Sequence, residues 1–384
     1  MLVRPIRKVI EDAVTIFASQ LAEWPRVVAY SNYAAFCDHA TTASFTKADD
    51  LTRLRVPEVF IGRYPPGAPV LGADSFWVQV GQSLVLEQIF ISSRLLRSFA
   101  PDPGAQAAAL RAAVPDTADI EEECVLLARY GWGTWGHWLN EILCKAVVAE
   151  AAFPGRFRYV LPAAIAREGT ERNFAGALIE SLRAYGIAER REIRIEPSKN
   201  YRFRSLFDVG GCTMWARSGV ILHPAVSHLM RERLSDAPAR ADSPLLAIER
   251  HGTTRTLVNA QEVNRELSAN GFVFIDPLAL GFREQMAYFR GAKTVFSVYG
   301  SGLANVLYSP PGIGALTCGP AYWGDTYFMY TVKERRGAYA DVRGPPFWNG
   351  VGHLFHAPFW IDPAEVNRAL AHLPVSKAQA SVGE

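Results

Sequence analysis

Several features that would place a chain of 384 residues in a familiar class are missing from this one. It has no block of like charge, and 40 Lys and Arg balance 38 Asp and Glu, which argues against a dedicated nucleic-acid binder. Its five cysteines form no Cys-x-x-Cys pair and fit a reduced, cytosolic setting better than a disulfide framework. No stretch reaches the roughly 20 apolar residues of a bilayer span. Glu11 and Asp12 interrupt the start, where a signal peptide needs an apolar core. We expect a cytoplasmic protein and leave open a peripheral attachment to the inner face of the cell membrane.

The common catalytic and metal-binding motifs are missing as well. There is no His-Glu-x-x-His, no paired Asp-x-Asp at a strand end and no cysteine cluster, so we expect no metal site and no resident cofactor. No Gly-x-Ser-x-Gly elbow marks a nucleophilic serine. A dinucleotide-binding Gly-x-Gly-x-x-Gly motif would need glycine at position 305, where this chain has Asn305. The sequence therefore does not favour a dehydrogenase.

What is present is a long alternation of strand-like and helix-like patterns. The length favours two domains. The first regular series predicts strands at 124–128, 157–161 and 191–195 around helices at 139–152 and 173–184. The second predicts strands at 245–248, 272–275, 294–298 and 315–317 around helices at 259–270 and 283–290. Strands that alternate with helices form parallel sheets, and such sheets bind ligands at the carboxyl ends of their strands. The sequence therefore predicts an α/β fold of two Rossmann-like domains that face each other across a cleft.

Weaker patterns set the expected domain boundaries. Residues 1–85 form an N-terminal appendage of strands and loops, 86–222 the N-terminal Rossmann-like domain and 223–345 the C-terminal one. Residues 346–384 form a C-terminal segment that would pack back on the N-terminal domain.

A glycine turn is the most informative segment of the second series. The predicted strand 294–298 runs into Tyr299-Gly300-Ser301-Gly302, and a short apolar helix ends at Pro310-Pro311-Gly312. Glycines let the backbone approach an anion, and a helix N-terminus offers unpaired N–H groups. The turn thus predicts a phosphate site, although the same turn also occurs without a ligand.

A second segment, Gly131 to Leu143, is rich in glycine and tryptophan. It delivers His137 to the first turn of a helix, with Glu141 four residues later on the same helix face. An imidazole and a carboxylate so placed can act as a general base and the group that orients it. In the alternative reading, His137 caps the helix and the tryptophans pack between domains.

Two arginines follow the strand 245–248. Arg250 and Arg255 would project into the cleft at the carboxyl edge of the sheet, where a guanidinium can bind phosphate with a fork of donors. Alternatively, both are solvated surface side chains. Asn259 is expected to cap the next helix, with Glu262 completing a capping box. Asp276-Pro277 is interpreted as an ordinary turn.

Taken together, these segments resemble family 61 glycosyltransferases of the bacterial capsular-polysaccharide type. The resemblance rests on four ordered blocks over roughly residues 120–320, about half the chain. They are Gly136-His-Trp-Leu with Glu141; Arg250, Arg255 and Asn259 with Glu262; Glu284-Gln285; and Gly300-Ser-Gly-Leu-Ala-Asn305 with Pro310-Pro-Gly312.

The resemblance implies a GT-B architecture, an inverting and metal-independent transferase, and a nucleotide-sugar donor, for which UDP is the first choice. The acceptor would be a glycan or glycolipid in cell-surface polysaccharide synthesis. It also implies that His137 and Glu141 face the reaction centre, and that a further set of residues contacts the donor. This set is Arg250, Arg255, Asn259, Tyr299, Gly300, Ser301, Gly302, Asn305 and Thr317.

Two positions depart from the family pattern. Tyr299 stands where the family usually has histidine, and Thr317 where it usually has glutamate. Tyrosine can donate a neutral hydrogen bond to phosphate but carries no positive charge near neutral pH. The departures imply an altered donor, other residues that fill the two roles, or a weakened catalyst. The alternative function is therefore a nucleotide- or sugar-binding protein on the same fold. The sequence identifies neither the sugar, the base, the acceptor nor the oligomeric state.

Overall fold

A computed structural model describes the conformation of most of the chain after residue 118 and of four short segments before it. The described residues are 59–63, 69–71, 77–80, 83–85, 119–128, 131–166, 174–196, 199–210, 212–216, 219–240, 242, 244–251, 254–320, 327–347 and 356–374.

The N-terminal half is built on a mixed sheet of eight strands. Strand β6 pairs in parallel with β5 on one side and with β7 on the other, and β8 pairs in parallel with the other side of β5. Strands β1 and β2 pair with β8 in the antiparallel sense, and β3 and β4 extend the sheet beyond β2. The bounds are β1 (Phe60–Arg63), β2 (Pro69–Leu71), β3 (Trp77–Val80), β4 (Ser83–Val85), β5 (Asp119–Leu126), β6 (Arg158–Pro162), β7 (Glu192–Ile195) and β8 (Tyr201–Gly210). The strands within residues 59–85 are thus hydrogen-bonded members of this sheet.

The C-terminal half is built on a parallel sheet of five strands in the order β12-β11-β13-β14-β15. They are β11 (Leu245–Ile248), β12 (Val273–Ile275), β13 (Thr294–Val298), β14 (Gly314–Pro320) and β15 (Ala338–Gly344). The chain proceeds from β11 to β12 on one side and then crosses back to β13 on the other. This reversal leaves a crevice beyond the carboxyl ends of β11 and β13, which is where open α/β sheets bind their ligands.

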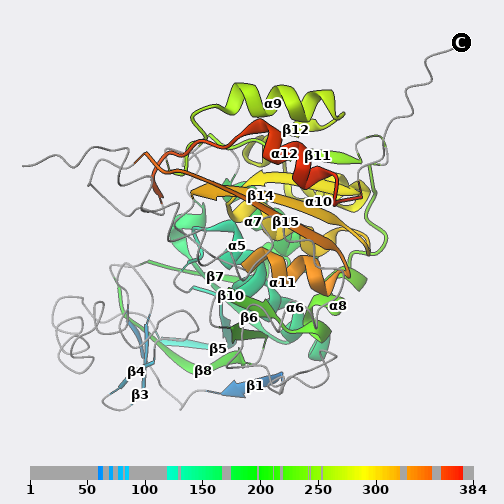
Figure 1. The fold of residues 1–384 in the computed structure, drawn as a ribbon. Coiled ribbons are helices and arrows are strands. Elements are labelled where there is room, and N and C mark those ends of the chain that lie inside the picture. Colours follow the sequence, from blue (N-terminus) through cyan, green and yellow to red (C-terminus); the bar gives the residue numbers. More distant parts are fainter. Residues whose placement is uncertain are drawn as a thin grey trace, which may run out of the picture.

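Helices cover both faces of the C-terminal sheet (Figure 1). On the outer face, α9 (Ala260–Ala269) and α12 (Pro363–Leu370) pack against each other, and α12 also packs on β15. Their apolar side chains form one hydrophobic cluster with the sheet. Between the two sheets, a larger cluster contains residues from both halves. Its helices include α5 (Trp135–His137), α6 (Cys144–Ala152), α7 (Phe174–Ala184), α8 (Pro224–Glu232), α10 (Phe282–Gly291) and α11 (Tyr327–Glu334), and the short hairpin of β9 (Thr213–Ala216) and β10 (Gly219–Leu222) contacts α11.

The two halves also share polar contacts. The carboxylate of Glu180 on α7 accepts hydrogen bonds from the backbone N–H groups of Phe282 and Arg283 at the start of α10. A carboxylate at a helix N-terminus satisfies donors that lack an intrahelical acceptor. The hydroxyls of Tyr185 and Tyr308 meet at 2.8 Å inside the shared cluster. The first contact joins α7 to α10, and the second joins the residue after α7 to Tyr308 at the end of a short 3₁₀ helix.

The structure confirms an α/β fold with parallel strands in both halves. The domain boundaries and the GT-B arrangement stay predictions. None of the helices in the described part of the chain has both the length and the apolar character needed to cross a bilayer.

One buried lysine gives the fold a testable pH dependence. Lys333 on α11 is 3% exposed, and its Nζ donates to the carbonyl of Gly337 at 3.2 Å. Burial lowers the pKa of this ammonium from 10.5 to about 7, so above about pH 7 the folded state binds fewer protons than the unfolded state. The free energy of unfolding should therefore rise with pH, by up to about 1.4 kcal/mol per pH unit from this group. Urea denaturation from about pH 6 to about pH 9 should show a steeper rise for the wild type than for Lys333→Met. An equal rise of the free energy of unfolding with pH in both proteins would contradict the lowered pKa of Lys333.

Candidate functional site

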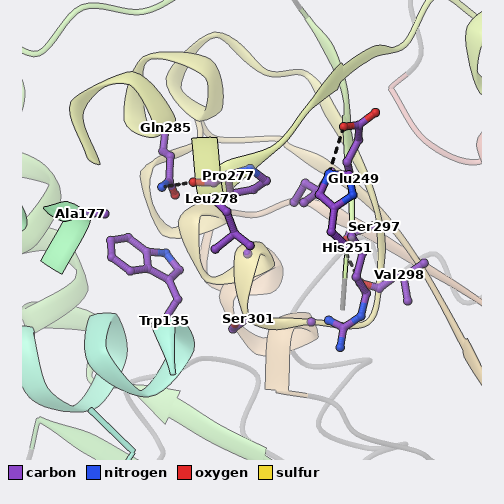
Figure 2. A pocket seen from close by; sticks show the side chains of 14 residues that line it. Trp135, Ala177, Glu249, His251, Pro277, Leu278, Gln285, Ser297, Val298 and Ser301 are labelled. Carbon is purple, nitrogen blue, oxygen red and sulfur yellow. Dashed lines mark hydrogen bonds and ion pairs between the residues drawn. The ribbon is translucent and has the colours of Figure 1, made fainter. Parts of the chain in front are cut away.

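A pocket opens at the crevice beyond β11 and β13 and has a cavity volume of about 210 Å³. That is less than the volume of a typical pocket for a drug-sized ligand, so it can enclose a ring and a phosphate while the rest of a longer ligand extends outside. Figure 2 shows Trp135 on one side of the pocket and Glu249 and His251 on the other. The lining residues are Trp135, Ala177, Ile248, Glu249, Arg250, His251, Pro277, Leu278, Gln285, Ser297, Val298, Gly300, Ser301 and Gly302. The structure therefore brings together Arg250 and the glycine turn, as the sequence predicts.

Arg250 gives this pocket its positive charge. Its Nε and Nη2 donate to the carbonyl and hydroxyl of Thr254, at 3.0 and 2.8 Å. No carboxylate among the residues that the structure describes forms an ion pair with it. Burial lowers the pKa of its guanidinium. An arginine nevertheless stays charged, so Arg250 presents a partly desolvated cation that an anionic ligand would stabilise.

Gly300 makes room for that cation. Its backbone is extended, with φ −175° and ψ 165°, so the conformation does not require glycine. A Cβ at this position, however, would lie 2.6 Å from Nη1 of Arg250. The 3₁₀ helix η6 (Ser301–Tyr308) begins directly afterwards. Its first N–H groups lack intrahelical acceptors and lie at the pocket wall, where they can bind an anion.

Gly300→Ala should weaken anion binding without unfolding the protein. The added methyl group would displace the far end of a flexible side chain, so the guanidinium moves and the backbone does not. We expect about a 10-fold loss of nucleotide affinity, or roughly 1.4 kcal/mol, measured by isothermal titration calorimetry. Gly176→Ala is the control, because a Cβ at that exposed position on α7 meets nothing within 4 Å. Equal affinities in the two variants would contradict the account.

A buried hydrogen-bond network holds the opposite wall of the pocket. The indole Nε1 of Trp135 donates to Oδ1 of Asn305 at 2.9 Å, and Nδ2 of Asn305 donates to Oε1 of Gln285 at 2.8 Å. Gln285 in turn donates to the carbonyls of Pro277 and Leu280. A satisfied buried network of this kind fixes the side chains that take part. Asn305 and Gln285 thus position Trp135 and the segment at Pro277, and Asn305 itself does not line the pocket.

His137 and Glu141 form the contact that their spacing predicts. Nδ1 of His137 lies 2.8 Å from Oε1 of Glu141. The helix passes through a π-helical segment, η2 (Trp138–Leu143), and π-helical turns in longer helices are frequent at functional sites. Glu141 is 7% exposed, whereas the His137 side chain is 28% exposed. If Nδ1 carries the proton toward the carboxylate, Nε2 is the basic nitrogen. Neither residue lines the pocket, although Trp135, two residues earlier, does.

Gly131 sets the position of His137. It has φ +85°, and a Cβ there would lie 2.9 Å from both Cβ and Cγ of His137. Gly131→Ala should therefore displace the imidazole and also strain the backbone by about 1–2 kcal/mol. We expect turnover to fall by roughly 10-fold at temperatures where the variant is folded. Gly133→Ala is the matched control, since a Cβ there meets nothing within 4 Å. Equal turnover in the two variants would show that His137 does not need its present position.

The structure places Arg255 and Asn259 outside the pocket lining. Arg255 has φ 56°, and its backbone N–H donates to the carbonyl of His356. Asn259 occupies the N-cap position of α9, as predicted. Its side chain makes no capping hydrogen bond, however, so the predicted capping box is wrong. Its amide group instead bonds with the backbone of Ile361 and with Glu262. Contacts between segments 102 residues apart compete for that amide, which local sequence reasoning cannot anticipate.

Tyr299 and Thr317 are buried, and β15 supplies charges beside them. The guanidinium of Arg343 lies 5.4 Å from the centre of the Tyr299 ring. Thr317 pairs in register with Asp341 and donates a 2.7 Å hydrogen bond to its carboxylate. Asp341 also binds Nε of Arg343 at 2.6 Å. The two positions therefore belong to a network across β13, β14 and β15.

Among the residues of the pocket wall that sequence reasoning did not single out are two polar ones, Glu249 and His251. The two polar ones flank Arg250 at the carboxyl end of β11. That position was a usable signal, because every side chain in this segment lies near the sheet edge where ligands bind.

One comparison with known proteins connects this geometry to a family. Residues 135–316 match the family model Glycosyltransferase 61, so this part of the chain is similar to a family of glycosyltransferases. The match confirms the resemblance to family 61 glycosyltransferases over this range, which begins at the pocket residue Trp135 and contains the glycine turn. The bacterial capsular-polysaccharide type stays a prediction. A search of curated proteins found no match.

Proposed function

We propose that this protein is an inverting, metal-independent glycosyltransferase that uses a nucleotide-sugar donor, with UDP as the first choice. The acceptor is a glycan or glycolipid in cell-surface polysaccharide synthesis. The enzyme acts in the cytoplasm or at the inner face of the membrane. The family match over residues 135–316 supports sugar transfer, and the pocket chemistry supports an anionic donor.

The observation that carries the proposal is Arg250 at the glycine turn. A guanidinium without a carboxylate partner among the described residues, the N-terminus of η6 and the crevice between β11 and β13 converge on one pocket. A diphosphate group matches all three features, because it carries negative charge and accepts hydrogen bonds from the guanidinium and from backbone N–H groups.

In the proposed reaction, the acceptor hydroxyl attacks the anomeric carbon on the face opposite the leaving group. His137 accepts the hydroxyl proton, and Glu141 orients and stabilises its imidazole; Glu141 is the second choice for the base itself. The bond between the anomeric carbon and the phosphate oxygen breaks, and the nucleoside diphosphate leaves with that electron pair. Arg250 and the N–H groups at Ser301 and Gly302 stabilise the negative charge that grows on the diphosphate. Displacement from the opposite face inverts the anomeric configuration.

The network on β15 favours one of the three explanations for Tyr299 and Thr317. Arg343 and Asp341 provide a cation and a carboxylate in contact with these two residues. We therefore favour replacement of the two roles by neighbouring residues over a weakened catalyst.

A thermal-shift screen with nucleotides and nucleotide sugars tests the proposal, because binding to the folded state raises apparent stability. Nucleotide sugars that stabilise the protein are then assayed for turnover with glycan and glycolipid acceptors in the presence of EDTA. We expect one nucleotide series to stabilise the protein and its sugar derivative to be turned over. No stabilisation by any nucleotide would overturn the proposal.

One observation favours a binding protein instead, namely that His137 and Glu141 do not line the pocket. That alternative predicts tight nucleotide-sugar binding in the same screen with no turnover, whichever acceptor is present.

A further inference from the structure

Three extended segments of the chain meet in a small ribbon beside the C-terminal sheet. Phe359 in the middle segment bridges Leu257 in the parallel sense and Pro346 in the antiparallel sense. All three residues are buried, and Leu257 and Phe359 belong to the hydrophobic cluster on the outer face of the sheet. One face of the ribbon is therefore part of the core.

The other face of the ribbon carries exposed apolar side chains. Val258, Trp360 and Phe347 each directly follow one of the three buried residues, and successive side chains of an extended chain point to opposite faces. They are 51%, 36% and 45% exposed. The backbone N–H of Val258 donates to Phe359 at 2.9 Å, and that of Phe347 donates to Pro358 at 2.7 Å. This register places Val258 beside Trp360 and Phe347 diagonal to it, so the three side chains form one apolar patch.

The area of the apolar patch does not suit a second copy of the protein. Phe and Trp side chains offer about 150–250 Å² each, so at these exposures the three side chains together present on the order of 250 Å². A stable protein interface buries about 800 Å² on each partner. Membrane anchoring needs a smaller contact, because its strength follows the apolar area that enters the lipid and requires no fit to a second surface.

The composition around the apolar patch also suits lipid. No Asp, Glu, Lys or Arg occurs from Gly344 to Ile361, and the first charges on either side are Arg343 and Asp362. A protein partner is usually recognised through a polar rim around an apolar centre, and this stretch offers no formal charge for such a rim. Tryptophan, by contrast, is enriched where a bilayer meets water, because its ring is apolar and its N–H is polar.

The apolar patch lies close to the pocket. The guanidinium of Arg250 donates to the carbonyl and hydroxyl of Thr254, and the next residue, Arg255, donates its backbone N–H to His356 in the middle segment of the ribbon. Val258 is only four residues beyond Thr254, which is at most about 14 Å along an extended chain. A bilayer that contacted the patch would therefore lie near the pocket.

We propose that the apolar patch inserts into the surface of a lipid bilayer, and that the acceptor is a glycolipid whose sugar reaches the pocket from that surface. The insertion stands on the patch alone, whereas the glycolipid acceptor rests on the proposed function. Of the acceptors considered above, the proposal selects the lipid-linked one.

Flotation with phosphatidylcholine vesicles tests the insertion, with the full-length chain as wild type, as the double variant Phe347→Ser/Trp360→Ser and as Val258→Glu. The three side chains are exposed, so both variants should fold, and circular dichroism checks this. We expect the wild type to float with the vesicles and each variant to need at least about 10-fold more lipid for half-maximal binding. Phe153→Ser is the matched control, because it removes an aromatic side chain of similar exposure, 41%, at the end of α6. It should bind like the wild type.

The outcomes separate the lipid contact from the alternatives. If the wild type does not float, or if the folded patch variants float equally well, the insertion is wrong. If sedimentation shows a wild-type dimer that the double variant dissociates, the patch is an interface between two copies and the proposal is also wrong.

A second measurement tests the glycolipid acceptor. A panel of hexadecyl glycosides in vesicles is compared with the corresponding methyl glycosides in solution. The wild type should transfer sugar at least about 10-fold faster to the hexadecyl form, since both partners are concentrated at the bilayer. The double variant should lose this preference and keep its rate with the methyl form. Equal preference in both proteins would leave the proposed function standing and overturn the glycolipid assignment. If no nucleotide sugar is bound or turned over, the proposed function and the glycolipid assignment fail together, and flotation alone decides the insertion.

Discussion

Replacing His137 with alanine should lower the rate of sugar transfer by at least about 100-fold, the usual contribution of a general base. The side chain is 28% exposed and makes its 2.8 Å contact to Glu141 within one helix, so its loss should leave the fold intact. Because His137 lies outside the pocket lining, donor affinity should change little. The effect should therefore appear in kcat, with the donor KM nearly constant.

The control for this prediction is His228→Ala, which removes an exposed histidine on α8. Glu141→Gln should give a smaller loss than His137→Ala, since the amide oxygen can still accept a hydrogen bond from Nδ1–H of His137 but carries no negative charge to stabilise the imidazolium. Normal turnover in His137→Ala would contradict the assignment of this residue as the general base.

Removing the charge of Arg250 should cost at least about 100-fold in kcat/KM, the scale seen when one donor to a developing negative charge is lost. Arg250→Met keeps an unbranched side chain of similar length while it removes the guanidinium. Both donor binding and turnover should suffer, because the diphosphate is anionic in the bound donor and more so as it leaves. Arg250→Lys should recover part of the loss, since it restores a charge without the forked geometry.

Arg265→Met is the matched control, because Arg265 is an exposed arginine on α9, away from the pocket lining. Steady-state kinetics with varied donor concentration separates the effect on kcat from that on KM. If Arg250→Met and Arg265→Met behaved alike, the phosphate end of the pocket would be misassigned.

Local patterns predicted the parts of the site that depend on short spacings. The alternation of strands and helices gave the two parallel series, and the i, i+4 rule gave the contact between His137 and Glu141. The rule that ligands bind at the carboxyl ends of strands predicted that Arg250 would lie near the glycine turn. The two meet because β11 and β13 are neighbours in the sheet.

The remainder of the architecture depends on contacts between distant segments. Trp135 and Asn305 are 170 residues apart in the chain, and only the packing of α5 on η6 brings the indole to the amide. The pairing of Thr317 with Asp341 depends on the register of β14 and β15. Polar residues such as Asn259 and Asn305 have the same appearance in sequence whether they bind a ligand or another part of the protein.

The most direct test of the central claim is a titration that adds phosphates one at a time. Calorimetry with a nucleoside, its monophosphate and its diphosphate compares the wild type with Arg250→Met. The account predicts that affinity rises by about 10-fold or more from nucleoside to diphosphate in the wild type, and that most of this gain disappears in the variant. Equal affinity for nucleoside and diphosphate, or a gain that persists without the guanidinium, would contradict a diphosphate site at Arg250 and the glycine turn.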